Sequence, residues 1–170
     1  MKKTIKKFGA YAFIIGIMLF FCMLYFGSRF DYGTQEFLGY ATIVIALSTV
    51  FFGVKYYRDQ ENNGKLSFKK ALSLGLFISV FVGLGIGLMD GFYVSVINPD
   101  FFQEYSEASM KVLKEAGDTQ KLEEMKAQMQ QFESMSPVAL SLFSGGLMFI
   151  TVMLVGLIIS ILSGLLLQKK

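Results

Sequence analysis

Four long apolar stretches alternate with polar segments along the 170-residue chain, at residues 8–27, 37–57, 71–97 and 137–167. Each contains the roughly 20 predominantly apolar residues that an α-helix needs to cross a hydrocarbon core of about 30 Å. The pattern therefore predicts an all-α, polytopic membrane protein, with one membrane domain over residues 1–170 and four transmembrane helices. The composition agrees, since 54% of the residues are hydrophobic and only 17% are charged.

The first apolar stretch follows a basic start, and together they resemble a secretory signal: MKKTIKKFGAYAFIIGIMLFFC. The apolar run is longer than the core of a signal peptide, and no small-residue cleavage site follows it. We therefore expect this stretch to be retained as the first membrane helix.

Basic residues gather on one side of the predicted helices. With the N-terminus in the cytoplasm, eleven of the sixteen Lys and Arg residues lie on the cytoplasmic side, and ten of the thirteen Asp and Glu residues lie outside. Cytoplasmic segments of membrane proteins carry this excess of Lys and Arg. Both termini and the loop 58–70 are therefore predicted to be cytoplasmic, and the segment 98–136 extracytoplasmic.

The loop 58–70 carries a turn signal at Asn62-Asn63-Gly64, and Ser67 is a suitable N-cap for the third helix. Its basic side chains are candidates for contact with anionic lipid headgroups. These are Arg58, Lys65, Lys69 and Lys70. The alternative is that they serve only to orient the helices.

The segment 98–136 contains two shorter helical patterns. The first begins at Asn98-Pro99-Asp100, with Asn98 as its cap, and ends at Gly117. The second begins at Asp118 or Thr119, and its apolar residues recur at helical spacing: Leu122, Met125, Met129 and Phe132. The segment is therefore predicted to form an extracytoplasmic amphipathic helical hairpin between the third and fourth membrane helices. Its apolar faces either pack on each other or on lipid headgroups, or they dock a protein partner.

Small residues recur at every fourth position of the third apolar stretch: Ala71, Gly75, Ser79, Gly83, Gly87, Gly91 and Ser95. A shorter series occupies the fourth stretch: Gly156, Ser160 and Gly164. Lipid provides no hydrophobic force between membrane helices, so close backbone approach along small residues is a main source of packing energy. We therefore expect a glycine-zipper contact of the third helix with the fourth in one chain. The alternative is packing against a second copy, which would make a homo-oligomer.

Asp90 is a charged residue within the glycine-rich part of the third stretch. Counting from Lys70, twenty helical residues already span about 30 Å. Asp90 is therefore predicted to lie at the outer headgroup boundary. The alternative is that Asp90 is buried in the bundle as a functional charge and needs a partner, for which Arg29 and Tyr40 are the candidates.

The chain has no histidine and a single cysteine, Cys22. This composition removes histidine-based triads and the histidine ligands of zinc and haem. The glycines do not form a dinucleotide-binding motif either, because position 88 is Leu where G-x-G-x-x-G requires its third glycine. We expect no catalytic, cofactor or metal site, and no nucleic-acid partner.

Three short motifs carry a resemblance to a known family. They are Tyr57-Arg58-Asp59, Gly64-Lys65-Leu66-Ser67-Phe68 and Pro99-Asp100-Phe101 before the acidic outer segment. In this order and spacing the chain resembles domain-of-unknown-function family 4199, a family of bacterial four-helix membrane proteins. The resemblance covers nearly the whole chain and implies a location in the bacterial inner membrane. It implies no reaction, cofactor or ligand.

Three functions are compatible with these features. The leading hypothesis is a non-enzymatic scaffold or accessory subunit that contacts membrane lipids and a protein partner through the outer hairpin. The first alternative is a small-solute or ion transporter or channel that acts as an oligomer. The second alternative is an enzyme at the inner lipid interface, with four candidate groups: Arg58, Asp59, Lys65 and Ser67.

Overall fold

The computed structural model describes residues 1–27 and 29–169. Within these residues the chain is helical almost throughout and has no strand. The elements in chain order are α1 (Lys2–Gly27), α2 (Tyr32–Tyr56), the π-helix η1 (Tyr57–Glu61), α3 (Phe68–Phe92), the π-helix η2 (Tyr93–Ile97), α4 (Phe101–Ala116), α5 (Thr119–Glu133) and α6 (Pro137–Leu167).

Four helices in the described part of the chain are long and apolar enough to cross a membrane, which confirms this part of the prediction. They cover Lys2–Gly27, Tyr32–Glu61, Phe68–Ile97 and Pro137–Leu167. They suggest a membrane protein with several spans. The second helix begins five residues earlier than expected because Asp31 caps it, and the Asp31 side chain accepts a hydrogen bond from the backbone N–H of Thr34 at 3.0 Å.

The third helix also begins earlier than the apolar pattern, at Phe68. Ser67 is its N-cap, as predicted, and the Ser67 hydroxyl accepts a hydrogen bond from the backbone N–H of Lys70 at 3.4 Å. A cap thus lets the helix include the basic residues that precede its apolar run, because the side chain satisfies a backbone donor that the first turn leaves unpaired.

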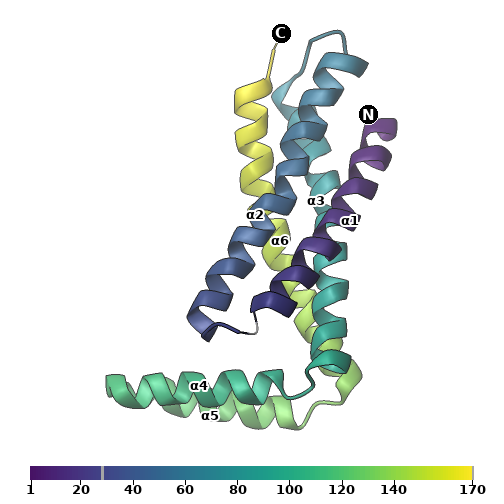
Figure 1. The fold of residues 1–170 in the computed structure, drawn as a ribbon. Helices are drawn as coiled ribbons and strands as arrows, with labels where there is room; N and C mark the ends of the chain where they lie inside the picture. The colour runs from purple at the N-terminus through teal and green to yellow at the C-terminus, as the bar shows by residue number, and fades with distance from the viewer. Residues whose placement is uncertain (28, 170) are drawn as a thin grey trace.

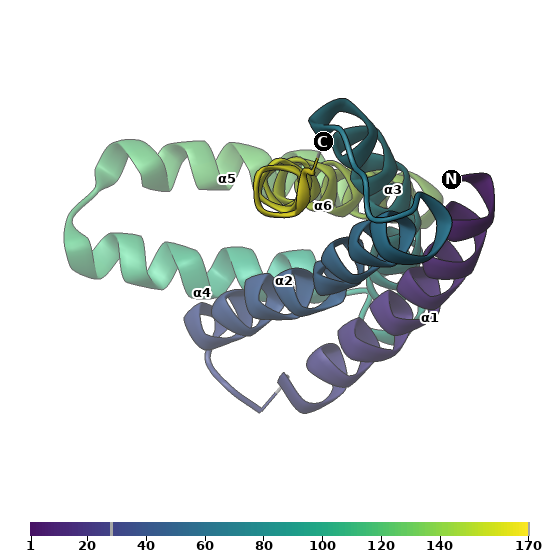
Figure 2. The ribbon, with the colours of Figure 1, turned by 90° about the horizontal axis from the view of Figure 1, so that it is seen from above.

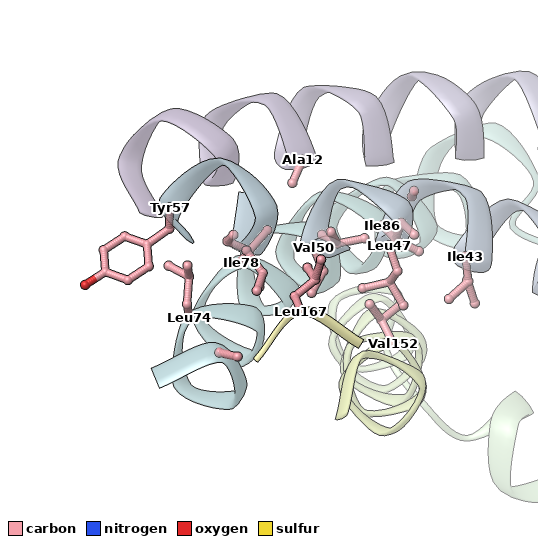
Figure 3. Packing of buried hydrophobic residues seen from close by; sticks show 14 of the residues in the cluster. Ala12, Ile43, Leu47, Val50, Tyr57, Leu74, Ile78, Ile86, Val152 and Leu167 are labelled. Atoms are coloured by element: carbon pink, nitrogen blue, oxygen red, sulfur yellow. The ribbon is translucent and has the colours of Figure 1, made fainter. Parts of the chain in front are cut away.

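The helix α3 lies at the centre of the four-helix bundle and contacts α1, α2 and α6. Its most extensive contact is with α6. Apolar side chains from all four helices fill the core (Figure 3). Labelled examples that are fully buried include Ala12, Leu47, Val50, Ile78 and Val152.

One end of the bundle holds the N-terminus, the α2–α3 connection and residue 169 (Figure 1). The amino group of Met1 pairs with the carboxylate of Glu61 at 2.8 Å. Leu66 and Lys169 exchange two backbone hydrogen bonds, at 2.7 and 2.8 Å. These contacts bring the basic segments that flank the long helices to the same end.

The helices α4 and α5, called the α4–α5 pair below, lie side by side across the opposite end of the bundle (Figures 1 and 2). Gly117 ends α4, as predicted, in the left-handed conformation with φ of 73°. Asp118 then caps α5 by accepting a hydrogen bond from the backbone N–H of Lys121 at 3.2 Å. Rings of Phe102 and Phe132 pack between the two helices with centroids 4.6 Å apart.

The N-cap predicted for the first helix of the outer segment, Asn98, is wrong. The helix α4 begins at Phe101, and Asp100 occupies the cap position without a side-chain hydrogen bond. The amide of Asn98 instead donates to the Glu104 carboxylate at 3.0 Å. Asn98 follows the π-helix η2, and its backbone N–H is already bonded to the carbonyl of Tyr93. The residue therefore ends one helix and does not start the next.

Candidate functional site

The small residues of α3 and α6 lie along the contact between these two helices. The Ser160 hydroxyl faces Gly75, and the Ser79 hydroxyl faces Gly156. Nearer the α4–α5 end, the backbones themselves meet. A Cβ atom added to Gly87 would lie 2.6 Å from the carbonyl oxygen of Gly145, which is closer than real Cβ atoms approach.

Other glycines along this contact face side chains of the opposite helix. Gly83 makes room for the ring of Phe149, and Gly164 makes room for the ring of Phe68. Gly91 faces Ser141, whose hydroxyl donates to the Gly91 carbonyl at 2.9 Å. The α3–α6 contact therefore depends on glycines, whose lack of a side chain lets the two helices approach along their length. Close packing between membrane helices requires such small residues.

This close approach places two polar side chains against each other. Asp90 on α3 and Ser144 on α6 are only 7% and 8% exposed, and the Ser144 hydroxyl donates a hydrogen bond to one carboxylate oxygen of Asp90. Among the described residues, no other hydrogen bond or ion pair reaches the Asp90 carboxylate. The charge is therefore shielded by protein and has one neutral partner.

Neither of the two partners expected for a buried Asp90 bonds to its carboxylate. Arg29 lies exposed in the α1–α2 connection and forms no ion pair with Asp90. Tyr40 lines the same cavity as Asp90 but makes no hydrogen bond to it. The depth of Asp90 in a bilayer is a separate property, and its position at the headgroup boundary stays a prediction.

A cavity of about 330 Å³ lies beside Asp90, between the end of the bundle and α4. Side chains of α1, α2 and α6 form its walls, and Phe101, Phe102 and Tyr105 of α4 form its floor. Tyr40 and Leu147 at its rim are 52% and 57% exposed, so the cavity opens to the outside between α2 and α6. Its size and largely apolar lining are typical of a small-ligand site.

Aromatic contacts hold α4 beneath the bundle and so define the floor of the cavity. The ring of Tyr32 lies 5.6 Å from the ring of Tyr105 and 6.4 Å from that of Phe101, measured between centroids. Phe101 also packs edge-on against Tyr93, at 5.8 Å. Such edge-to-face pairs stabilise a fixed arrangement beyond the area that they bury.

The polar groups that line the cavity are acidic or neutral. Asp90 and Glu36 contribute carboxylates, and no Lys or Arg is among the lining residues. In the described residues no group of three or more His, Cys, Asp or Glu side chains is placed to hold a metal ion. The arrangement suits a ligand that is apolar over most of its surface and carries at most one or two polar or cationic groups.

The basic candidates at the other end of the bundle are only partly brought together. Lys65 and Lys70 line a second hollow, of about 670 Å³, with Lys169. Arg58 pairs with its neighbour Asp59 at 2.6 Å. Lys69 is exposed and does not line this hollow.

Three residues of this region, Ser144, Gly145 and Glu36, were not among the site residues predicted from the sequence. A signal existed for Ser144, because it lies twelve residues before Gly156, which is three steps of four on the same face of α6. Glu36 had no such signal. Its place in the site depends on how α2 is positioned against the distant helix α4.

The comparisons with known proteins agree with the resemblance seen in the motifs. A family model described as "Protein of unknown function (DUF4199)" matches residues 7–169. Searches of curated proteins and of solved structures give no significant match. Because the family model covers nearly the whole chain, this protein belongs to the DUF4199 family.

Proposed function

We propose that this protein is a non-enzymatic scaffold or accessory subunit of the bacterial inner membrane, and that the α4–α5 pair is its contact surface on the extracytoplasmic side. The observation that carries the proposal is the placement of this pair. It crosses the end of the bundle and continues beyond it (Figure 1), with no buried residue in α5 and only Ser106 buried in α4.

Exposed apolar side chains on the pair support a contact role. Val112 is 65% exposed and Tyr105 is 38% exposed. Both line a hollow of about 730 Å³ that is bounded by the start of α2 and by α5. Met125 from α5 also lines this hollow, and methionine adapts readily to the shape of a partner.

The distribution of charged residues supports an orientation with the α4–α5 pair on the extracytoplasmic side. The N-terminal lysines, the basic α2–α3 connection and Lys169 share one end of the bundle, and the α4–α5 pair lies at the other. Because the cytoplasmic side of a membrane protein carries the excess of Lys and Arg, the basic end is assigned to the cytoplasm.

Photo-crosslinking in living cells tests the contact surface. A photoreactive amino acid replaces Val112 in one strain and Leu154, an exposed residue in the middle of α6, in another. We expect a discrete protein adduct from position 112, which is lost when Tyr105 is changed to Glu, and lipid adducts from position 154. Lipid adducts alone at both positions would contradict the scaffold and show that the pair rests on headgroups.

A small-solute transporter is the second candidate, favoured by the shielded carboxylate of Asp90 beside a cavity. Fully buried Leu47, Val50 and Ile78 lie between this cavity and the basic end. Transport would therefore require the bundle to open. Flux into liposomes that depends on the protein and is lost in Asp90→Asn would establish this function over the scaffold.

A further inference from the structure

The cavity beside Asp90 combines three features that a contact surface does not need. It is lined by residues of five helices, it is largely apolar, and it contains a carboxylate that is 7% exposed. A charge in such surroundings costs free energy unless a partner compensates it. The Ser144 hydroxyl supplies one hydrogen bond but no positive charge.

The Asp90 carboxylate forms no ion pair with a Lys or Arg side chain among the described residues. The ion pairs of this part of the chain involve Glu61, Asp59, Asp118 and Glu123, and none involves Asp90. A second carboxylate, Glu36, lines the same cavity, and no Lys or Arg does. The cavity is therefore formally negative, and an anionic ligand would be repelled.

Besides the two carboxylates, the cavity is lined by several aromatic rings that could recognise a ligand. Among them are the side chains of Tyr32, Tyr40, Phe101, Tyr105 and Phe143, which come from α2, α4 and α6. Aromatic faces attract organic cations, and aromatic cages with nearby carboxylates are typical of sites for alkylated ammonium groups. A bare metal ion fits less well, because hard cations need six or more oxygen ligands.

We infer that this cavity binds an alkylammonium group attached to an apolar body, with Asp90 as the counter-charge and the aromatic lining around the alkyl groups. The opening between Tyr40 and Leu147 lets the apolar part extend toward the surrounding lipid. Two kinds of molecule contain such a group: a membrane lipid with an amine headgroup, and a free amphiphilic amine.

Calorimetric titration of the full-length protein in maltoside micelles tests the inference. The probes are phenylbutyl-trimethylammonium and its uncharged isostere, in which a tert-butyl group replaces the trimethylammonium. We expect the unaltered protein to bind the cation with a dissociation constant at least about tenfold lower than that of the uncharged isostere. Equal affinities for the two probes would overturn the inference, because the cavity would then recognise only apolar shape.

Two variants locate the charge that makes the difference. Asp90→Asn removes the charge and keeps an oxygen that can accept from Ser144. Glu115→Gln removes a carboxylate from α4 that does not line the cavity. We expect Asp90→Asn to abolish the preference for the cation and Glu115→Gln to leave it unchanged. Retained preference in Asp90→Asn, or an equal loss in both variants, would overturn the assignment to this cavity.

Competition distinguishes the two sources of the ammonium group. Phosphatidylethanolamine and phosphatidylglycerol with the same acyl chains are each added to the micelles before the cationic probe. Weaker binding of the probe with phosphatidylethanolamine only would identify a lipid headgroup as the occupant. Unchanged binding with both lipids would identify a free amphiphilic amine.

Discussion

The hydroxyl of Ser144 in α6 donates a hydrogen bond to the carboxylate of Asp90 in α3, although the two residues are 54 positions apart in the chain. Both side chains are more than nine-tenths buried. The bond forms because the two helices approach closely on either side of it, where Gly87 meets Gly145 and Gly91 meets Ser141. Backbone packing and the candidate site therefore depend on each other.

Ser144→Ala should destabilise the protein by about 1–3 kcal/mol, because it leaves a buried carboxylate oxygen without its donor. Asp90→Asn should cost less, since the side-chain oxygen of Asn can still accept from Ser144. Thermal unfolding in detergent measures both. A lower unfolding temperature for Asp90→Asn than for Ser144→Ala would contradict this account of the pair.

Two neighbouring glycines of α6 should respond differently to the same substitution. In Gly145→Ala the new Cβ would lie 2.5 Å from the carbonyl oxygen of Gly87, so the helices must separate, at a cost of about 1–3 kcal/mol. In Gly146→Ala nothing lies within 4 Å of the new Cβ. Because Ala has the higher helix propensity, this substitution should leave the stability unchanged or raise it slightly. Unfolding temperatures of the two variants give the comparison, and equal values would show that the contact is loose.

Gly117→Val should loosen the α4–α5 pair without affecting the four-helix bundle. Gly117 has φ of 73°, which costs an ordinary L-residue about 1–2 kcal/mol. Nothing crowds this position, so the effect comes from the backbone alone. Hydrogen exchange should become faster in residues 101–133 and stay unchanged in α3. Gly117→Asn is the control and should be milder, because Asn tolerates this conformation.

The first turn of α5 should lose protection in acid. The backbone N–H of Lys121 and, after it, the Lys121 side chain hold the pKa of Asp118 below its usual value. The cap is therefore fully present at pH values above the pKa of an unfolded-chain aspartate and is lost as the pH falls through the lower pKa of the folded state. Hydrogen exchange in residues 119–122 measures the loss. Asp118→Asn should remove the pH dependence, since Asn caps a helix but does not titrate.

Single cysteines should reveal the orientation in intact cells. In a Cys22→Ser background, an impermeant thiol reagent should label Ser109→Cys and leave Asn63→Cys unlabelled. Position 109 lies on the α4–α5 pair, and position 63 lies in the connection at the basic end. The reverse pattern would invert the assignment that rests on the distribution of Lys and Arg.

Local patterns predicted most of the secondary structure because each depends on a few adjacent residues. The caps at Ser67 and Asp118 and the stop at Gly117 needed only one side chain or one glycine near a helix end. The same reasoning failed at Asn98, where the backbone of η2 had already engaged the residue. A local signal is unreliable where two helices end and begin within three residues.

Length and hydropathy are properties of the chain itself, so four helices capable of crossing a membrane could be predicted without any knowledge of their neighbours. The cavity could not. Its walls come from five helices, and its carboxylate Asp90 meets Ser144 only because α3 and α6 pack antiparallel in one register. That register is decided by which glycine faces which backbone carbonyl, a contact between distant segments that no local pattern encodes.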